Sequence, residues 1–148
     1  MAEGDGRLYG AFLSNVLKKV INLDVSQDAL RAILMSTFTP NYDTNDVYAT
    51  ISGNEISGSG YAATGDGLAN TSNVVAVVSA SDWVKFDVED ASWAALATAT
   101  PTYAVPYDDT PTSPADPLIG TIVLGTTAPN GGQYNIVFNS AGLLYITY

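Results

Sequence analysis

Hydrophobic and polar residues alternate in two different ways along this 148-residue chain. In residues 9–21, apolar side chains recur every three or four positions, which predicts an amphipathic helix. The residues of this apolar stripe are Tyr9, Phe12, Leu13, Val16, Leu17, Val20 and Ile21. The opposite face of the helix holds Ser14, Asn15, Lys18 and Lys19. We expect either that the stripe packs on the rest of the chain or that the helix is an arm that docks on a neighbouring subunit.

After the helix, the pattern changes to short runs of β-branched and aromatic residues between clusters of Gly, Ser, Thr, Asn and Asp. This pattern predicts a mainly β fold, an antiparallel β-sandwich of jelly-roll or immunoglobulin-like type. The predicted strands are residues 30–37, 74–79, 83–88, 102–107, 118–124, 133–138 and 143–148, with weaker candidates at 46–51 and 55–57. Residues 29–35 are rich in helix formers, but their position favours a strand. Pro106 lies inside a predicted strand, so we expect an edge strand or a bulge there.

The length and the order of these segments predict one domain over residues 1–148, with an N-terminal helix or arm in 1–21 and a sandwich body in 22–148. A chain of this size buries about 68–70% of its unfolded surface, so it needs no disulfide or metal to stabilise its core. No apolar run reaches the ~18 residues of a membrane-spanning helix. The acidic N-terminus lacks the cations and the apolar core of a secretory signal. We therefore expect neither a membrane protein nor Sec export.

The net charge of the chain is −10, and this charge is unevenly distributed. Residues 1–31 carry four basic and four acidic residues, whereas the rest of the chain carries Lys85 and eleven acids. Nucleic-acid binding depends largely on Lys and Arg, so DNA and RNA are excluded as expected partners. The asymmetry indicates either an acidic body opposite a neutral N-terminal face or only a need for solubility.

The chain has no Cys and no His, which removes disulfides, the usual zinc ligands and the common general base near pH 7. Paired carboxylates would be the remaining catalytic option. Asp108 and Asp109 are adjacent, so in an extended segment they point to opposite faces and cannot converge. Asp87, Glu89 and Asp90 follow a predicted strand and resemble a solvated turn. We therefore predict that the chain is not an enzyme and carries no cofactor.

A calcium loop is one alternative that the sequence raises. Asn41, Asp43 and Asn45 alternate as oxygen donors, as at the start of an EF-hand loop. Asp46 then stands where that loop needs Gly, and Ser52 where it needs a bidentate Glu. An Asx turn, in which these side chains bond to their own backbone, is therefore the favoured interpretation, and no metal site is predicted.

Residues 53–61 are rich in glycine, but no Lys follows them as it would in a phosphate-binding loop. We expect Gly58 and Gly60 to supply positive φ angles in a tight connection, and Tyr61 to anchor this loop on the body.

Aromatic residues are the remaining candidates for binding. Trp83 and Trp93 flank the acidic cluster, where they can pack in the core, stack on a sugar or anchor a subunit interface. Tyr103 and Tyr107 share one face of a regular strand and form either part of the core or an exposed patch.

Several segments, taken in order, resemble a family of small structural proteins of tailed-bacteriophage virions. The segments are FTPNYDTNDVY at residues 38–48, NEISGSGY at 54–61, YAVPYDDT at 103–110, PLIG at 117–120 and NSAGLLYIT at 139–147. The family's usual glycines after the second segment are replaced here by Ala62-Ala-Thr, and the basic residue of its first strand is retained as Arg31. The resemblance implies a β fold in a virion and no catalytic residue.

The resemblance leads to an expected function that is structural. We expect a capsid decoration or cement protein that is assembled in the host cytoplasm and binds the major capsid protein or another virion protein, with neither nucleic acid nor membrane as a partner. The alternative is a tail-associated or fibre-associated module that binds a host glycan. Because shell lattices offer three-fold sites, we expect a homo-oligomer, a trimer. The predicted partner-binding residues are Leu8, Tyr9, Phe12, Leu13, Val16, Leu17, Lys18 and Lys19.

Overall fold

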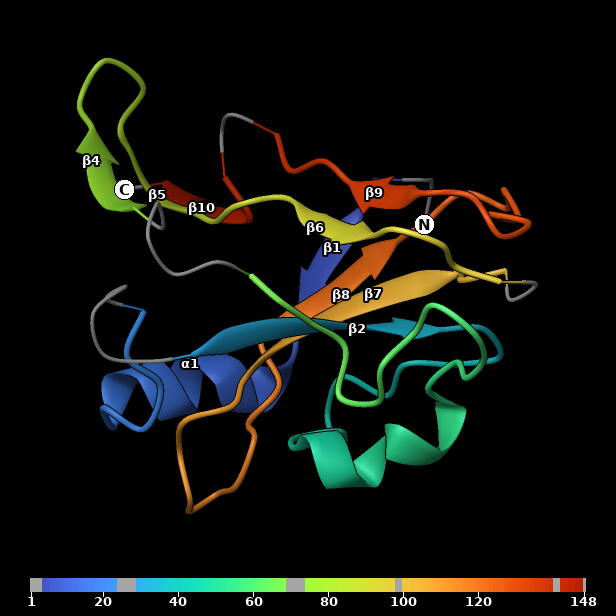
Figure 1. Cartoon of the computed structure of the whole chain (residues 1–148). Coiled ribbons are helices and arrows are strands. Elements are labelled where there is room, and N and C mark those ends of the chain that lie inside the picture. Colours follow the sequence, from blue (N-terminus) through green and yellow to red (C-terminus); the bar gives the residue numbers. More distant parts are fainter. Residues whose placement is uncertain (1–3, 24–28, 69–73, 98–99, 140–141, 148) are drawn as a thin grey trace.

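The computed structural model describes residues 4–23, 29–68, 74–97, 100–139 and 142–147. These residues form a mainly β fold with antiparallel sheets packed in a sandwich-like arrangement and one short N-terminal helix (Figure 1). The predicted fold class is therefore confirmed.

A five-stranded sheet lies at the centre of the fold, with strand order β1-β8-β7-β2-β3. Its strands are β1 (Gly6–Leu8), β8 (Gly120–Val123), β7 (Tyr103–Asp108), β2 (Leu30–Met35) and β3 (Asp66–Gly67). Above it in Figure 1 lie a three-stranded sheet, β10-β5-β4, and a two-stranded sheet, β6-β9. Their strands are β10 (Leu144–Thr147), β5 (Trp83–Asp87), β4 (Val74–Val78), β6 (Ala91–Trp93) and β9 (Tyr134–Ile136).

Strand β2 explains why the helix-forming run at residues 29–35 is a strand. Its even-numbered residues Leu30, Ala32 and Leu34 face a core cluster between the sheets, which also includes Phe86. Its odd-numbered residues Ile33 and Met35 face a second cluster on the other side of the sheet. Because both faces are buried, the strand is apolar at every position except Arg31, and burial outweighs the helical preference of Leu, Ala and Met.

The sequence suggested either an edge strand or a bulge at Pro106, and the structure shows a bulge in a central strand, β7. Strand β7 pairs with β8 through Tyr103↔Val123 and Ala104↔Ile122, but its next contact, Tyr107↔Leu118, is shifted by one residue. The carbonyl of Pro106 accepts a hydrogen bond from the Ile119 N–H, so the side of Pro106 that lacks an N–H faces this bulge. The proline thus lies in a central strand at a place where the ladder is already interrupted.

The predicted helix is shorter than expected. Helix α1 spans Gly10–Leu17 rather than residues 9–21, and it ends because Lys19 adopts a positive φ of 59°. The Lys19 N–H donates to the Val16 carbonyl and the Val20 N–H to the Asn15 carbonyl, which is a Schellman motif. In the described residues no helix is long and apolar enough to cross a membrane.

Other boundaries differ from the predictions. The weak strand at residues 46–51 is wrong: Tyr48–Thr50 and the adjoining Ser52–Asn54 form two 3-10 helices, η1 and η2. Local bonds favour this turn, because the Thr50 hydroxyl donates to the Val47 carbonyl at 2.6 Å. The weak strand at 55–57 is reduced to one bridge, Met35↔Glu55. Strands β1, β3 and β6 were not predicted, and Tyr148 of the predicted last strand lies outside the described residues.

Candidate interaction surface

The N-terminal segment is built into the body rather than extending from it as an arm. Strand β1 pairs with β8 from Gly6↔Ile122 to Leu8↔Gly120. Tyr9 and Phe12 are each 1% exposed, and they pack in the two different core clusters. Of the two roles that the amphipathic pattern suggested, packing on the body accounts for these side chains.

The structure separates the eight predicted partner-binding residues into two groups. Tyr9 and Phe12 are buried, and Leu8 and Val16 are partly buried against the core. The other four, Leu13, Leu17, Lys18 and Lys19, are exposed. Asn15, predicted on the polar face, is buried. The helix is therefore rotated so that one row of leucines points away from the core, and only this row and the two lysines are available to a partner.

Leu13 and Leu17 belong to a larger apolar surface. Among the described residues, five of the exposed large apolar side chains come from α1 and from the face of the outer sheet that lies toward α1, and we call this set the α1–outer-sheet surface. Its members are Leu13 and Leu17 of α1, Val75 and Val77 of β4, and Ile146 of β10. Tyr145 is also exposed, but it alternates with Ile146 along β10 and points to the opposite face of the sheet. Leu17 is 84% exposed, although burial of a leucine side chain usually stabilises a protein. A contiguous apolar surface is typical of a protein-binding site.

A groove lies between the helix and the outer sheet. Its volume is about 190 Å³. Phe12, Leu13 and Val16 line it from the helix side, and Val75, Phe86 and Ile146 are among the residues that line it from the sheet side. The sequence prediction therefore identified one wall of this groove. It missed the other wall, because nothing in the sequence pattern shows that β4 and β10 lie beside the helix.

A second, larger hollow of about 650 Å³ lies beside β1 and β8 and is bounded by parts of residues 136–145. Asp5 and Arg7 supply its charged side chains. The Arg7 guanidinium lies 4.1 Å from the centre of the Tyr42 ring, a cation–π contact that holds the arginine against the body.

The two tryptophans have different environments. Trp93 is 5% exposed and stacks against Tyr61, with ring centres 6.2 Å apart, so it is a core residue. Trp83 is half-buried and packs against the exposed Tyr145, with ring centres 4.8 Å apart. The indole N–H of Trp83 is buried without a hydrogen-bond partner. Trp83 and Tyr145 thus form an aromatic pair at the outer sheet.

The carboxylates in the described part of the chain lie in separate local environments. Asp108 is fully buried, whereas the side chain of Asp109 is 41% exposed, in agreement with the prediction that neighbouring acids point apart. Asp87 pairs with Lys85 at 2.9 Å, and Asp90 accepts a hydrogen bond from the Phe138 N–H. Within the described residues no group of three acids, cysteines or histidines is placed to hold a metal.

The Asn41 loop is an Asx turn, as favoured. The Asn41 side chain accepts a hydrogen bond from the Asp43 N–H, and the Asn45 side chain accepts one from the Asn41 N–H. These oxygens bond to their own loop rather than converging on a cation.

Tyr61 anchors the glycine-rich loop, as predicted. Its hydroxyl donates to Glu55 Oε1 at 2.6 Å and accepts from the Leu34 N–H at 3.1 Å, while the Tyr48 hydroxyl donates to Glu55 Oε2 at 2.6 Å. Burial and the contact with Glu55 raise the pKa of Tyr48 to about 12, and the same two causes raise the pKa of Tyr61 further. Gly58 and Gly60 have φ angles of 136° and 81°, as expected.

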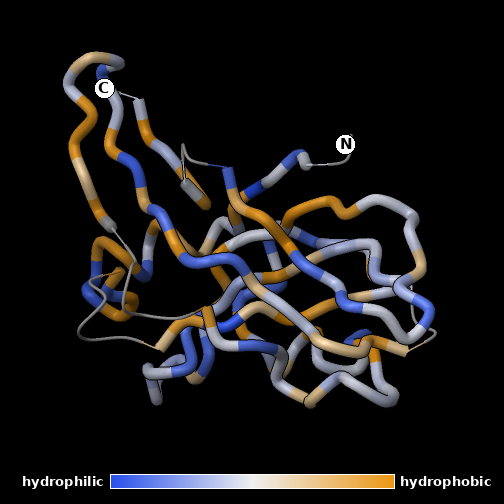
Figure 2. Tube along the Cα trace, turned by 45° about the horizontal axis from the view of Figure 1, so that its top comes forward, coloured by the Kyte–Doolittle hydropathy of each residue, from blue (hydrophilic) through white to orange (hydrophobic). Residues whose placement is uncertain are grey.

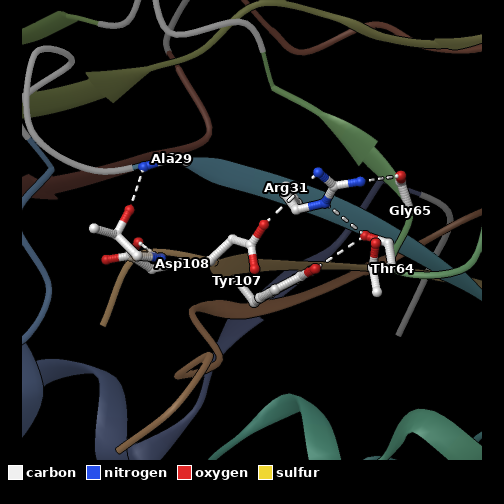
Figure 3. Close-up of polar contacts among 8 residues, drawn as sticks. Ala29, Arg31, Thr64, Gly65, Tyr107 and Asp108 are labelled. Atoms are coloured by element: carbon white, nitrogen blue, oxygen red, sulfur yellow. Dashed lines mark hydrogen bonds and ion pairs between the residues drawn. The ribbon is translucent and has the colours of Figure 1, made fainter. Parts of the chain in front are cut away.

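A polar network at the other end of β2 fixes the start of the long loop at residues 108–117 (Figure 3). Arg31 donates to the carbonyls of Thr64 and Gly65 at 2.9 and 2.8 Å, and it lies 3.7 Å from Asp109. Burial and the charge of Asp109 raise the pKa values of both Tyr107 and Asp116. These contacts join groups within the fold, so the network has a structural role.

Searches of protein-family models, of curated protein sequences and of solved structures found no match to this chain.

Proposed function

We propose that this chain is a non-enzymatic structural component of a tailed-bacteriophage virion, a decoration protein that binds the outer surface of the capsid. The observation that carries the proposal is the α1–outer-sheet surface. It brings together five exposed apolar side chains of α1, β4 and β10 in a chain that has a net charge of −10. The sequence resemblance to small phage virion proteins supplies the setting.

The mechanism would be interfacial. A decoration protein stabilises a shell because it binds the assembled lattice and not the dissociated subunits, which shifts the equilibrium toward the shell. Leu13 and Leu17 would make the apolar contact with the major capsid protein, and Lys18 and Lys19 at the end of α1 would face acidic groups of that partner. Many copies on one particle would add their individually small contributions.

The proposal is tested by binding the purified chain to particles that lack it. We expect Leu13→Gln combined with Leu17→Gln to reduce occupancy at least tenfold, because both side chains are exposed and their loss leaves the fold intact. Val137→Gln is the matched control, since Val137 is 74% exposed but lies outside the surface. Equal binding by the double variant and the control would exclude this surface as the docking site.

A second candidate function is a tail-associated or fibre-associated module that binds a host glycan. It is favoured by the aromatic pair of Trp83 and Tyr145, because partly exposed rings on a sheet are a common platform for sugars. Trp83→Ala would then abolish glycan binding. Cryo-electron microscopy of the native particle separates the two candidates: density repeated over the head supports decoration, and density confined to the tail supports adhesion.

A further inference from the structure

Strand β4 is an open edge of the outer sheet. In the part of the chain that the structure describes, β4 pairs only with β5, in a register from Val74↔Asp87 to Val78↔Trp83. Figures 1 and 2 both show the β4–β5 hairpin projecting at one corner of the molecule. In such an edge strand, every second residue presents its N–H and C=O outward, where they can pair with another strand.

This edge lacks the usual protection. Natural edge strands are guarded by lysines, prolines or bulges, and β4 has none of these in its sequence Val-Val-Ala-Val-Val. Val75 and Val77 are 55% and 66% exposed, so the strand is also apolar on an open face. The nearest charges on β5, those of Lys85 and Asp87, form an ion pair with each other.

We propose that β4 of a second copy of this chain adds antiparallel to β4, with the two-fold axis of the dimer passing midway between the two copies of Ala76. A two-fold axis at this position places Ala76 opposite Ala76, and Val75 opposite Val77 of the second copy. Strand β4 contains only Val and Ala, so two copies of it meet without like charges or polar side chains opposite each other.

Side-chain packing supports this register. Residues directly opposite each other in an antiparallel pair lie on the same face of the sheet, and β-branched pairs at such positions stabilise it. Within one chain, Ile146, Val84 and Val77 already lie side by side across β10, β5 and β4. In the dimer, Val75 of the second copy extends this row, and the two outer sheets become one continuous sheet.

Electrostatics also favours β4 as the place where two copies meet. Each chain carries a net charge of −10, so two copies repel each other wherever acidic residues approach. Strand β4 is uncharged, and Lys85 lies opposite Ala76, the residue on the proposed axis. The dimer should therefore become more stable as salt screens the remaining repulsion. This inference does not depend on the proposed virion function.

Charge-exchange variants test the pairing and its register. The variant Val75→Lys/Val77→Lys places lysines opposite lysines in the dimer, and Val75→Glu/Val77→Glu does the same with glutamates. We expect sedimentation to show a dimer for the unchanged chain, a monomer for each variant alone, and a heterodimer when the two variants are mixed. Val137→Lys is the control, which should remain a dimer. Circular dichroism shows whether each variant is folded.

Crosslinking at the axis provides an independent test. The chain contains no cysteine, and opposite Cα atoms in an antiparallel pair lie about 4.5–5.5 Å apart, within the range of a disulfide. Ala76→Cys should form a disulfide-linked dimer under mild oxidation, and Val137→Cys should not. A monomeric or trimeric unchanged chain, a dimer that survives both charged variants, or no crosslink at position 76 would each overturn the proposal.

Discussion

Arg31 lies directly opposite Tyr107 across the β2–β7 ladder, and the two side chains donate hydrogen bonds to one carbonyl oxygen, that of Thr64. The Arg31 guanidinium also reaches the Gly65 carbonyl at 2.8 Å. The loop before β3 is thus held by a charged group and a phenol from adjacent strands. A hydrogen bond from a charged donor contributes more to stability than a neutral one.

Replacing Arg31 should therefore cost more than replacing its ion-pair partner. We expect Arg31→Ala to lower the free energy of unfolding by about 2–3 kcal/mol, since two carbonyls lose a charged donor. Asp109→Ala should cost less than about 1 kcal/mol, because the pair is 3.7 Å apart and the Asp109 side chain is 41% exposed. Urea unfolding of both variants measures the difference. Equal losses of unfolding free energy in the two variants would show that the ion pair, rather than the carbonyl contacts, stabilises the loop before β3.

The raised pKa of Tyr48 predicts that the protein loses stability at high pH. Burial and the hydrogen bond to Glu55 raise its pKa from 10.0 to about 12, so the folded state keeps a proton that the unfolded state releases. This contribution is fully present below pH 10 and is lost as the pH rises through about 12. Tyr48→Phe should flatten the decline of unfolding free energy with pH in this range. An equally steep decline in Tyr48→Phe and in the unchanged chain would contradict this role of the Tyr48 hydroxyl.

A substitution at Gly60 tests the geometry of the glycine-rich loop. Its φ is 81°, and a Cβ at this position would lie 1.9 Å from the Ala95 carbonyl oxygen. Gly60→Ala should lower the unfolding free energy by at least about 1–3 kcal/mol from backbone strain alone. Gly53→Ala should be close to neutral, since nothing lies within 4 Å of its added Cβ. Thermal unfolding of the two variants provides the comparison, and a neutral Gly60→Ala would contradict the close approach of the two segments.

The opposite faces of α1 should respond differently to mutation. Phe12 is 1% exposed, so Phe12→Ala should cost about 3–5 kcal/mol. Leu17 is 84% exposed, and Leu17→Gln should change stability by no more than about 0.5 kcal/mol. Denaturant unfolding measures both values. If Phe12→Ala were as harmless as Leu17→Gln, the helix would be an undocked arm in solution.

The strands that could be predicted from the sequence are those with strong local patterns. Strands β4 and β8 are rich in β-branched residues, β5 combines Val84 with the aromatic Trp83 and Phe86, and each lies within a predicted segment. β1 contains Gly6 and Arg7, and β3 is only Asp66–Gly67, so neither has a local signal. These two strands exist because a neighbouring strand offers a free edge, which is a property of the tertiary fold.

The candidate surface shows the same division between local and tertiary information. The helical spacing of residues 9–21 identified Leu13 and Leu17 as apolar and accessible to a partner. It also placed Tyr9 and Phe12 in the same group, because periodicity gives a face but not its direction. The contribution of Ile146 depends on the pairing of β10 with β5, which joins segments far apart in the sequence.

The pairing of β1 with β8 has a consequence for synthesis. Gly6 and Leu8 leave the ribosome more than a hundred residues before their partners Ile122 and Gly120. Until then, the first strand has nothing to pair with, and Phe12 lacks contacts with core residues that come from the last strands. Because such distant contacts form slowly and late, the central sheet is completed only after β8 has been synthesised. Until then, the nascent chain holds the apolar residues of its helix segment uncovered.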